Sequence, residues 1–245
     1  MGQDGISSGA FRSAAARELA PSARGRLSKE SSEERTGSFF RDDDRQATLV
    51  DGPDGRGPRA NSVSPYHEIA LSKLSKQLKT PEGYIRLSAP FEHDNIVNGD
   101  GLRVVLWTQG CPNHCKGCQN PETWDYEAGY LAKIDDLKKE LKTFRGQAGI
   151  TFCGGEPFVQ ARACKEIADW CRKELKWNVW SFTGFTYEII KEYGKDPWEL
   201  LTSLDALIDG PFILKQRDLS LRFRGSKNQR LLKLELGTGK ILSIE

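Results

Sequence analysis

Three closely spaced cysteines are the residues of this sequence most suited to chemistry. Cys111, Cys115 and Cys118 lie in the stretch GCPNHCKGC, with the pattern C-x3-C-x2-C. A structural zinc site needs four ligands, and His114 or Cys153 could supply the fourth. An iron-sulfur cubane held by three thiolates instead leaves one iron open to another molecule. Because an iron with a free coordination position can bind a substrate, the missing fourth cysteine favours a reactive centre.

A second candidate is the tripeptide Gly154, Gly155 and Glu156, in the stretch CGGEP. It ends the short apolar run GITFCGG, which is typical of a buried strand. Glycine permits a positive φ and a close approach of the backbone to a ligand, and glutamate offers a carboxylate to a ligand ammonium group. Taken alone, the tripeptide predicts only a turn that ends a strand.

Other sulfur-bearing and charged residues have simpler interpretations. Cys164 and Cys171 lie on one side of a predicted helix, which is typical of small core residues. Cys153 is predicted to be a strand-end thiol that faces the core. Asp209 ends a predicted strand, where it either contacts a cofactor or cation or caps a turn. The basic loop RGSKNQR, Arg224–Arg230, is either a solvated loop or a contact to a partner or cofactor.

The two motifs follow predicted strands, and the elements around them alternate. Repeated strand-helix units indicate a parallel sheet covered by helices, which is an α/β fold. Such folds carry their chemistry at the carboxyl ends of the strands, where both motifs lie. The tail RLLKLELGTGKILSIE predicts a C-terminal β-hairpin around Gly-Thr-Gly. The predicted strands are RVVLWTQG, GITFCGG, NVWSFTG and ALIDGPF, and the predicted helices are Leu131–Phe144, Ala161–Leu175, Thr186–Tyr193 and Pro197–Leu204.

The sequence divides into three parts of different composition. Residues 1–63 are rich in charge, glycine and proline and have no apolar period, so they predict a disordered extension. Residues 64–80 predict a short helical appendage, with Ser64 and Pro65 at its start. Residues 81–245 predict the folded domain, which is long enough to bury a core without disulfides or structural metals.

Charge and hydropathy exclude several classes of function. The 36 basic and 34 acidic residues give a net charge of +2 and are interleaved along the chain, so no nucleic-acid partner is predicted. No run of eighteen apolar residues occurs, and so no membrane span is predicted. We expect a cytoplasmic protein whose cysteines are reduced.

The cysteine spacing, directly after a strand, resembles that of the radical S-adenosylmethionine (SAM) enzymes. Within them, the stretch DNIVNGDGLRVVLWTQGCPNHCKGCQNPETWD is similar to the activases of glycyl radical enzymes. TGFTYEII, IDGPF and RGSKNQR resemble the activating proteins of anaerobic ribonucleoside-triphosphate reductase, so that the resemblance spans Phe91 to Arg230. Activases of pyruvate formate-lyase usually have Asp-Thr-Asn-Gly where this chain has SFTG, Ser181–Gly184, which argues against that assignment.

The resemblance implies a [4Fe-4S] cluster held by Cys111, Cys115 and Cys118, with the open iron binding the amino and carboxylate groups of SAM. It also implies that the Gly-Gly-Glu tripeptide binds SAM. In the implied reaction the reduced cluster donates one electron to SAM, and the 5′-deoxyadenosyl radical that results removes a hydrogen atom from a glycine of the reductase. The implied fold is a partial, open (β/α) barrel of about six strands, of the radical SAM type.

The implied partners are the anaerobic ribonucleoside-triphosphate reductase, as protein substrate, and a flavodoxin- or ferredoxin-type electron donor. Two alternatives stay open. One is an activase of another glycyl radical enzyme, such as pyruvate formate-lyase. The other is a zinc-binding module with His114 or Cys153 as the fourth ligand, which predicts a colourless protein without SAM affinity.

Overall fold

The computed structural model of the chain describes residues 75–76 and 78–245. The predicted disordered extension, and all but the end of the predicted helical appendage, lie outside these residues. Contacts divide the chain into the units Met1–Pro58 and Arg59–Glu245, and the described residues all belong to the second. None of the helices in this described part is both long and apolar enough to cross a bilayer.

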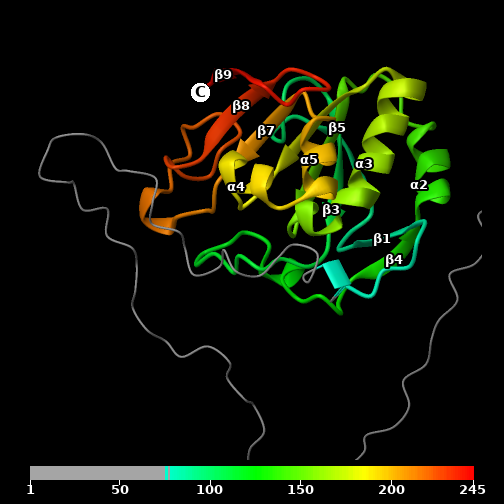
Figure 1. The fold of residues 1–245 in the computed structure, drawn as a ribbon, viewed down its shortest axis with the longest axis horizontal. Helices are drawn as coiled ribbons and strands as arrows, with labels where there is room; N and C mark the ends of the chain where they lie inside the picture. The colour runs from blue at the N-terminus through cyan, green and yellow to red at the C-terminus, as the bar shows by residue number, and fades with distance from the viewer. Residues whose placement is uncertain (1–74, 77) are drawn as a thin grey trace, which may run out of the picture. The chain divides into compact units, whose positions relative to one another are not determined.

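The core of the described part is a nine-stranded sheet with the order β4-β1-β3-β5-β6-β7-β8-β9, in which β2 also pairs with β3 (Figure 1). Strands β3, β5, β6 and β7 are parallel, and the other pairs are antiparallel. The order ends at β4 and β9, so the sheet is not closed. The strands are β1 Tyr84–Leu87, β2 Glu92–Asn95, β3 Arg103–Thr108, β4 Tyr130–Lys133, β5 Gly149–Gly154, β6 Asn178–Phe182, β7 Ala206–Asp209, β8 Arg230–Leu234 and β9 Ile241–Ile244.

This sheet confirms the predicted α/β class and corrects its details. The four predicted parallel strands are present as β3, β5, β6 and β7, and the predicted C-terminal hairpin is β8 with β9. The prediction of about six strands was too low, because β1, β2 and β4 add antiparallel pairs at one side. These strands have four residues each, and β1 and β4 pair with each other across more than forty residues, so local patterns did not reveal them.

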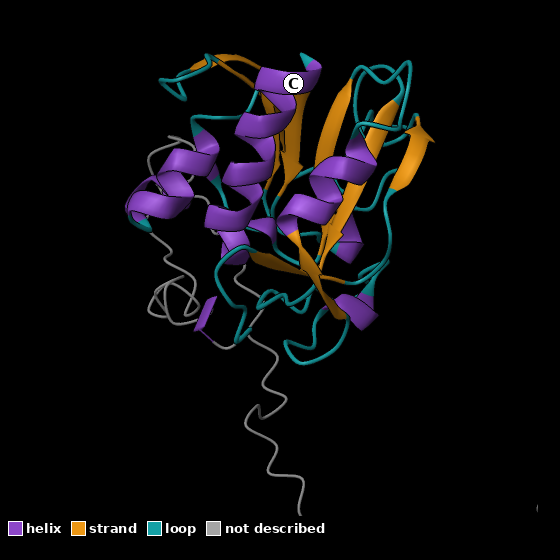
Figure 2. Ribbon diagram, turned by 90° about the vertical axis from the view of Figure 1, so that its right-hand side faces the viewer, coloured by secondary structure: helices purple, strands orange, loops and turns teal. Residues whose placement is uncertain are grey.

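Helices cover one face of the sheet, as the views in Figures 1 and 2 both show. The helix predicted from Leu131 begins later, because Tyr130–Lys133 forms β4 and pairs with β1 instead. The helix predicted to reach Leu175 ends its α-helical part at Trp170 and continues as a π-helical turn. The helices are α2 Ile134–Leu141, α3 Ala161–Trp170, α4 Tyr187–Glu192 and α5 Lys195–Leu201.

Alternating side chains separate the two faces of the sheet. On β6, Val179 belongs to the large apolar core beneath the helices, whereas Trp180 belongs to a smaller cluster on the opposite face. Trp180 meets Phe223 edge to face, with ring centres 5.5 Å apart. The Lys233 ammonium lies 3.9 Å from the centre of the same ring. Around Trp180, the face without helices is therefore covered by a loop residue and a cation.

Arg103 joins the amino ends of three parallel strands although its side chain is fully buried. Its guanidinium donates to the Thr151 hydroxyl at 2.5 Å, to the Ile150 carbonyl at 2.6 Å and to Asn178 Oδ1 at 2.7 Å. Burial lowers the pKa of Arg103 to about 10, which leaves the group charged at neutral pH. A buried cation is tolerated because its donors are satisfied by polar partners.

We predict that Arg103→Met lowers the free energy of unfolding by about 3 kcal/mol, because methionine leaves these buried acceptors without a donor. Arg145→Met is the matched control, since Arg145 is exposed and surface substitutions change stability by about 0.5 kcal/mol or less. Urea denaturation of the two variants measures the difference. Equal stabilities of the two variants would contradict the assigned role.

Candidate functional site

The three cysteines lie in the loop that follows β3, drawn in green in Figure 1. The loop is closed at its base, where Gly110 N–H donates to the Thr123 carbonyl at 2.8 Å and Cys111 N–H to the Trp124 carbonyl at 3.3 Å. Within it, Cys118 N–H donates to the Cys115 carbonyl at 3.0 Å. The predicted position of the cysteine loop at a carboxyl strand end is therefore confirmed.

Two sulfurs of this loop receive a hydrogen bond from an N–H group. Asn113 Nδ2 lies 3.7 Å from Cys111 Sγ, and Asn120 N lies 3.4 Å from Cys118 Sγ. Burial raises the pKa of Cys111 to about 12 and also raises that of Cys115. Burial therefore favours the protonated thiols. A bound metal favours the thiolates instead, because thiolates and not thiols are metal ligands.

The other two residues considered as metal ligands are His114 and Cys153. The His114 ring stacks on Trp124, with ring centres 4.8 Å apart and planes 9° apart. Cys153 alternates with Phe152, which belongs to the core beneath the helices, so Cys153 faces the opposite side of the sheet. Throughout residues 75–76 and 78–245, no group of three or more His, Cys, Asp or Glu side chains forms a site for one metal ion.

The Gly-Gly-Glu tripeptide is held against the start of the cysteine loop. Gly155 N–H donates to the Thr108 carbonyl at 2.7 Å, and Glu156 N–H donates to the Gly110 carbonyl at 2.9 Å. Gly154 has φ +96°, and a Cβ atom on Gly155 would lie 2.6 Å from the Gly110 carbonyl oxygen. Both glycines are therefore required by the approach of two backbones, whatever ligand they contact.

The Glu156 carboxylate is fully buried and accepts four hydrogen bonds from protein groups. Oε1 accepts from Phe158 N at 3.1 Å and from the Thr183 hydroxyl at 2.9 Å. Oε2 accepts from Asn113 Nδ2 at 3.1 Å and from Gly184 N at 2.8 Å. Burial raises the pKa of Glu156 to about 7, and the four hydrogen bonds oppose that rise. The carboxylate thus connects the ends of β5 and β6 with the cysteine loop.

Asn113, Thr183 and Gly184 are site residues that the sequence did not reveal. A Cβ atom on Gly184 would lie 2.2 Å from Asn113 Nδ2, so glycine is required there for the amide to reach Glu156. For Thr183 and Gly184 the sequence did hold one indication: they directly follow β6, and they lie at the same end of the sheet as the two motifs. Single amides and hydroxyls are too common in loops for such a signal to be read without the contacts.

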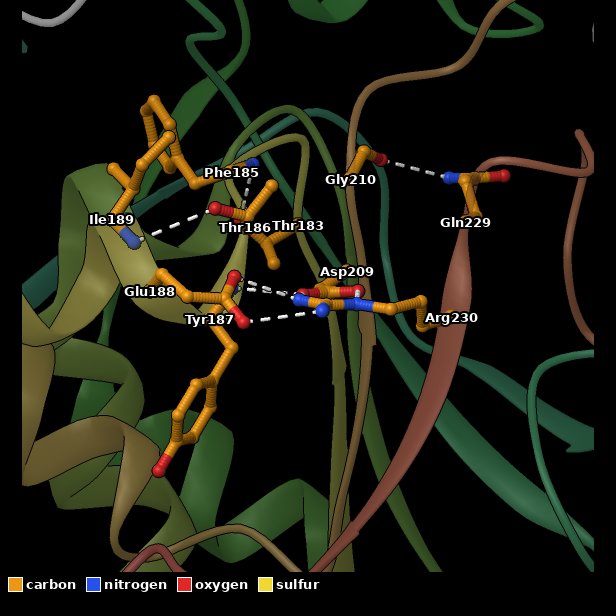
Figure 3. A network of polar contacts seen from close by, with 10 residues as sticks. All are labelled: Thr183, Phe185, Thr186, Tyr187, Glu188, Ile189, Asp209, Gly210, Gln229 and Arg230. Atoms are coloured by element: carbon orange, nitrogen blue, oxygen red, sulfur yellow. Dashed lines mark hydrogen bonds and ion pairs between the residues drawn. The ribbon is translucent and has the colours of Figure 1, made fainter. Parts of the chain in front are cut away.

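Asp209 is held by protein groups at the end of β7 (Figure 3). Its carboxylate is 1% exposed, pairs with the Arg230 guanidinium and accepts from Tyr187 N at 2.8 Å. Arg230 also pairs with Glu188 at 2.9 Å. Asp209 raises the pKa of Arg230, and Arg230 in turn lowers that of Glu188. The capping interpretation of Asp209 therefore fits its contacts, since these groups join β7, β8 and the start of α4.

The loop Arg224–Arg230 folds back on the segment after β7. Gln229 donates to the Gly210 carbonyl at 3.0 Å, as Figure 3 shows, and Asn228 donates to the Pro211 carbonyl at 2.7 Å. The Ser226 hydroxyl accepts from Ile213 N at 3.1 Å. These bonds hold residues 210–214, whose Leu214 side chain lies against Gly117 of the cysteine loop. Arg224 Nε is buried without a hydrogen-bond partner.

Two of the three remaining cysteines are core residues, whereas Cys153 lies on the opposite face of the sheet, so the prediction that it faces the core was wrong. Cys164 and Cys171 are buried in the apolar cluster beneath the helices, which confirms their predicted role. Burial raises the pKa of Cys171 to about 12. Neither thiol belongs to the cysteine loop.

Comparison with known proteins agrees with these motifs. The family described as "4Fe-4S single cluster domain" matches residues 97–232, which is more than half of the chain. The anaerobic ribonucleoside-triphosphate reductase-activating protein of Haemophilus influenzae is 35% identical over 159 residues, which cover 58% of this chain and 94% of that protein. The chain belongs to this family of 4Fe-4S activating proteins. The family's cofactors, a [4Fe-4S] cluster and SAM, are those of this chain.

Two further matches were found. One is a relative that matches over fewer residues, and the other is a solved structure with low similarity. The pyruvate formate-lyase 1-activating enzyme of Escherichia coli (strain K12) is 36% identical over 123 residues, which cover 48% of each chain. The crystal structure of QueE from Escherichia coli has a TM-score of 0.35 and 14% identity, over 49% of this chain and 58% of that one. A TM-score this low supports no inference about the fold.

The donor set of the cysteine loop fits the cluster of this family. A cubane spreads three thiolates over three irons, whereas zinc gathers its ligands on one ion. Three thiols lie in one loop, and two of them, Cys111 and Cys118, accept a hydrogen bond from an N–H group. This donor set is compatible with the first arrangement. Two of these residues, Cys115 and Cys118, are partly exposed and so accessible to iron.

We predict that Gly155→Ala lowers the free energy of unfolding by about 3 kcal/mol, because the new Cβ must displace the Gly110 backbone. Gly146→Ala is the matched control. Gly146 has φ +72° and open space around it, so an added Cβ meets no other atom. Gly146→Ala should lower the free energy of unfolding only by backbone strain of about 1 kcal/mol. Thermal unfolding of the cluster-free variants measures both, and a smaller loss in Gly155→Ala would contradict the close approach.

Proposed function

We propose that this chain activates an anaerobic ribonucleoside-triphosphate reductase by generating a glycyl radical on it. The observation that carries the proposal is the pairing of the three-thiol loop with the Gly-Gly-Glu turn, at the carboxyl ends of the adjacent parallel strands β3 and β5. Relatives that match over nearly their whole length are named as activating proteins of this reductase. Both lines of evidence favour the same chemistry.

Within this function, Cys111, Cys115 and Cys118 hold the cluster. Gly154 and Gly155 present their backbone to SAM. The Glu156 carboxylate supplies negative charge for the SAM ammonium group and orients the groups around it. Because its acceptor positions are filled by four protein donors, Glu156 acts on SAM mainly by position and charge unless one donor moves away.

When bound, the cluster supplies one electron to SAM, whose cleavage gives methionine and the 5′-deoxyadenosyl radical that takes a hydrogen atom from a glycine Cα of the reductase. The protein binds and orients the reactants for this step. Residues 210–214 lie beside the cysteine loop and limit access to it from that side, where Leu214 contacts Gly117. None of these roles requires a general base.

Three finer features stay part of the proposal. A partial, open (β/α) barrel is supported by four parallel strands with helices on one face. A flavodoxin- or ferredoxin-type protein is the expected electron donor, since the chemistry needs a one-electron reductant. The expected location is the cytoplasm, where thiols stay reduced.

The activation itself is tested by anaerobic reconstitution with iron and sulfide, followed by SAM, dithionite and purified anaerobic ribonucleoside-triphosphate reductase. We predict a glycyl radical signal on the reductase in electron paramagnetic resonance, together with methionine and 5′-deoxyadenosine. Omission of SAM is the control and should leave no radical. SAM cleavage without a radical on the reductase would contradict the assigned partner.

Pyruvate formate-lyase is the alternative partner, because its activating enzyme shares 36% identity with this chain over 123 residues. A parallel reaction with that enzyme separates the two. A radical on pyruvate formate-lyase and none on the reductase would transfer the assignment to the sister function, whereas the reverse result supports the proposal.

The ligand set is tested by alanine variants of the three loop cysteines. We predict that each variant binds little iron and lowers SAM cleavage by about 100-fold or more, because each removes a cluster ligand. Cys153→Ala is the control, and it should keep the iron content of the unchanged protein. Loss of metal in Cys153→Ala, with zinc in place of iron, would instead support the zinc-binding alternative.

A further inference from the structure

Asn113 contacts both halves of the site at once. Its Nδ2 atom lies 3.7 Å from Cys111 Sγ and 3.1 Å from Glu156 Oε2. A side-chain amide carries two N–H bonds, so Nδ2 can donate to the sulfur and to the carboxylate together. The residue therefore joins the cluster loop to the group expected at SAM.

Two independent features hold the Asn113 amide in this position. The Cα of Gly184 lies so close that a Cβ atom there would be 2.2 Å from Nδ2, which leaves no space for another residue type. The reversed amide would place its oxygen against the Glu156 carboxylate, which is electrostatically unfavourable. Gly184 N donates to the same Oε2 atom at 2.8 Å, so amide, carboxylate and glycine form one closed set of contacts.

We propose that Asn113 is a positioning residue that couples the reduction potential of the cluster to the binding of SAM. An N–H bond to a ligand sulfur stabilises the reduced cluster, because that state carries more negative charge on the sulfurs. The same amide fixes the orientation of Glu156. A shift of the amide that improves one contact changes the other, so the two properties depend on one another.

This inference rests on the proposed function only for the roles of Cys111 as cluster ligand and Glu156 as part of the SAM site. The partner protein does not enter it. Its readouts are the midpoint potential and the SAM affinity, which need neither the reductase nor turnover. Its failure can therefore be distinguished from failure of the activation assay.

The test compares Asn113→Ala with Thr183→Val. Both remove one donor to Glu156, but only the first also removes a donor to Cys111. Redox titrations followed by electron paramagnetic resonance give the midpoint potential with and without SAM, and calorimetry gives the SAM affinity. We expect both variants to bind SAM about fivefold more weakly, from the loss of one hydrogen bond.

Only Asn113→Ala should be harder to reduce. We expect its ratio of reduced to oxidised cluster, at a fixed applied potential without SAM, to fall about tenfold, which is ~59 mV for one electron. Its change in potential on adding SAM should also be smaller than that of the unchanged protein. An unchanged potential, or an equal shift in Thr183→Val, would overturn the proposal, since a general loosening of the site explains the latter.

A second variant disturbs the contact between the Asn113 amide and the Cys111 sulfur without changing Asn113. Gly184→Ala keeps Asn113 but forces its amide away, because the added Cβ occupies the position of Nδ2. We expect Gly184→Ala to lower the potential in the same direction, with iron content measured in every sample. If Asn113→Ala binds no cluster, Gly184→Ala decides alone, and an unshifted potential in it overturns the proposal.

Discussion

The buried carboxylate of Glu156 is the contact on which the geometry of the site depends. Removing a carboxylate from water costs several kcal/mol unless its oxygens are satisfied, so the four donors around it are held where they are. Those donors come from the cysteine loop, from the turn after β6 and from the residues after Glu156 itself. One side chain thus fixes the ends of two strands and a loop that has little secondary structure of its own.

The backbone contacts around the Gly-Gly-Glu turn act with the carboxylate. Gly154 and Gly155 have no Cβ atom to keep β5 away from the residues that enter the cysteine loop, and two hydrogen bonds cross the short gap. At the other side of the site, Asp209 and Arg230 hold β7 to β8 in a similar way. The carboxyl ends of the strands are therefore organised by polar contacts, whereas the face beneath the helices is organised by apolar packing.

The sequence predicted what local patterns and motif spacing determine. The four parallel strands follow from apolar runs, and the cysteine loop and the Gly-Gly-Glu turn follow from their spacing. Strand β4 was missed because Leu131 fits a helical period as well as a strand, and only its pairing with Arg86 of β1 decides between them. Asn113 and Thr183 were missed for a related reason, since an isolated polar side chain has no pattern until its partner is known.

These contacts also relate the stability of the site to its redox behaviour. The N–H donors to these sulfurs come from the loop itself: Asn113 donates to Cys111 and Asn120 donates to Cys118. Under the proposed function these sulfurs are cluster ligands, and N–H donors to cluster sulfurs raise the reduction potential, so the position of the loop is expected to affect that potential. Under the proposed function, a change that loosens the loop is expected to weaken the fold and also to make the cluster harder to reduce.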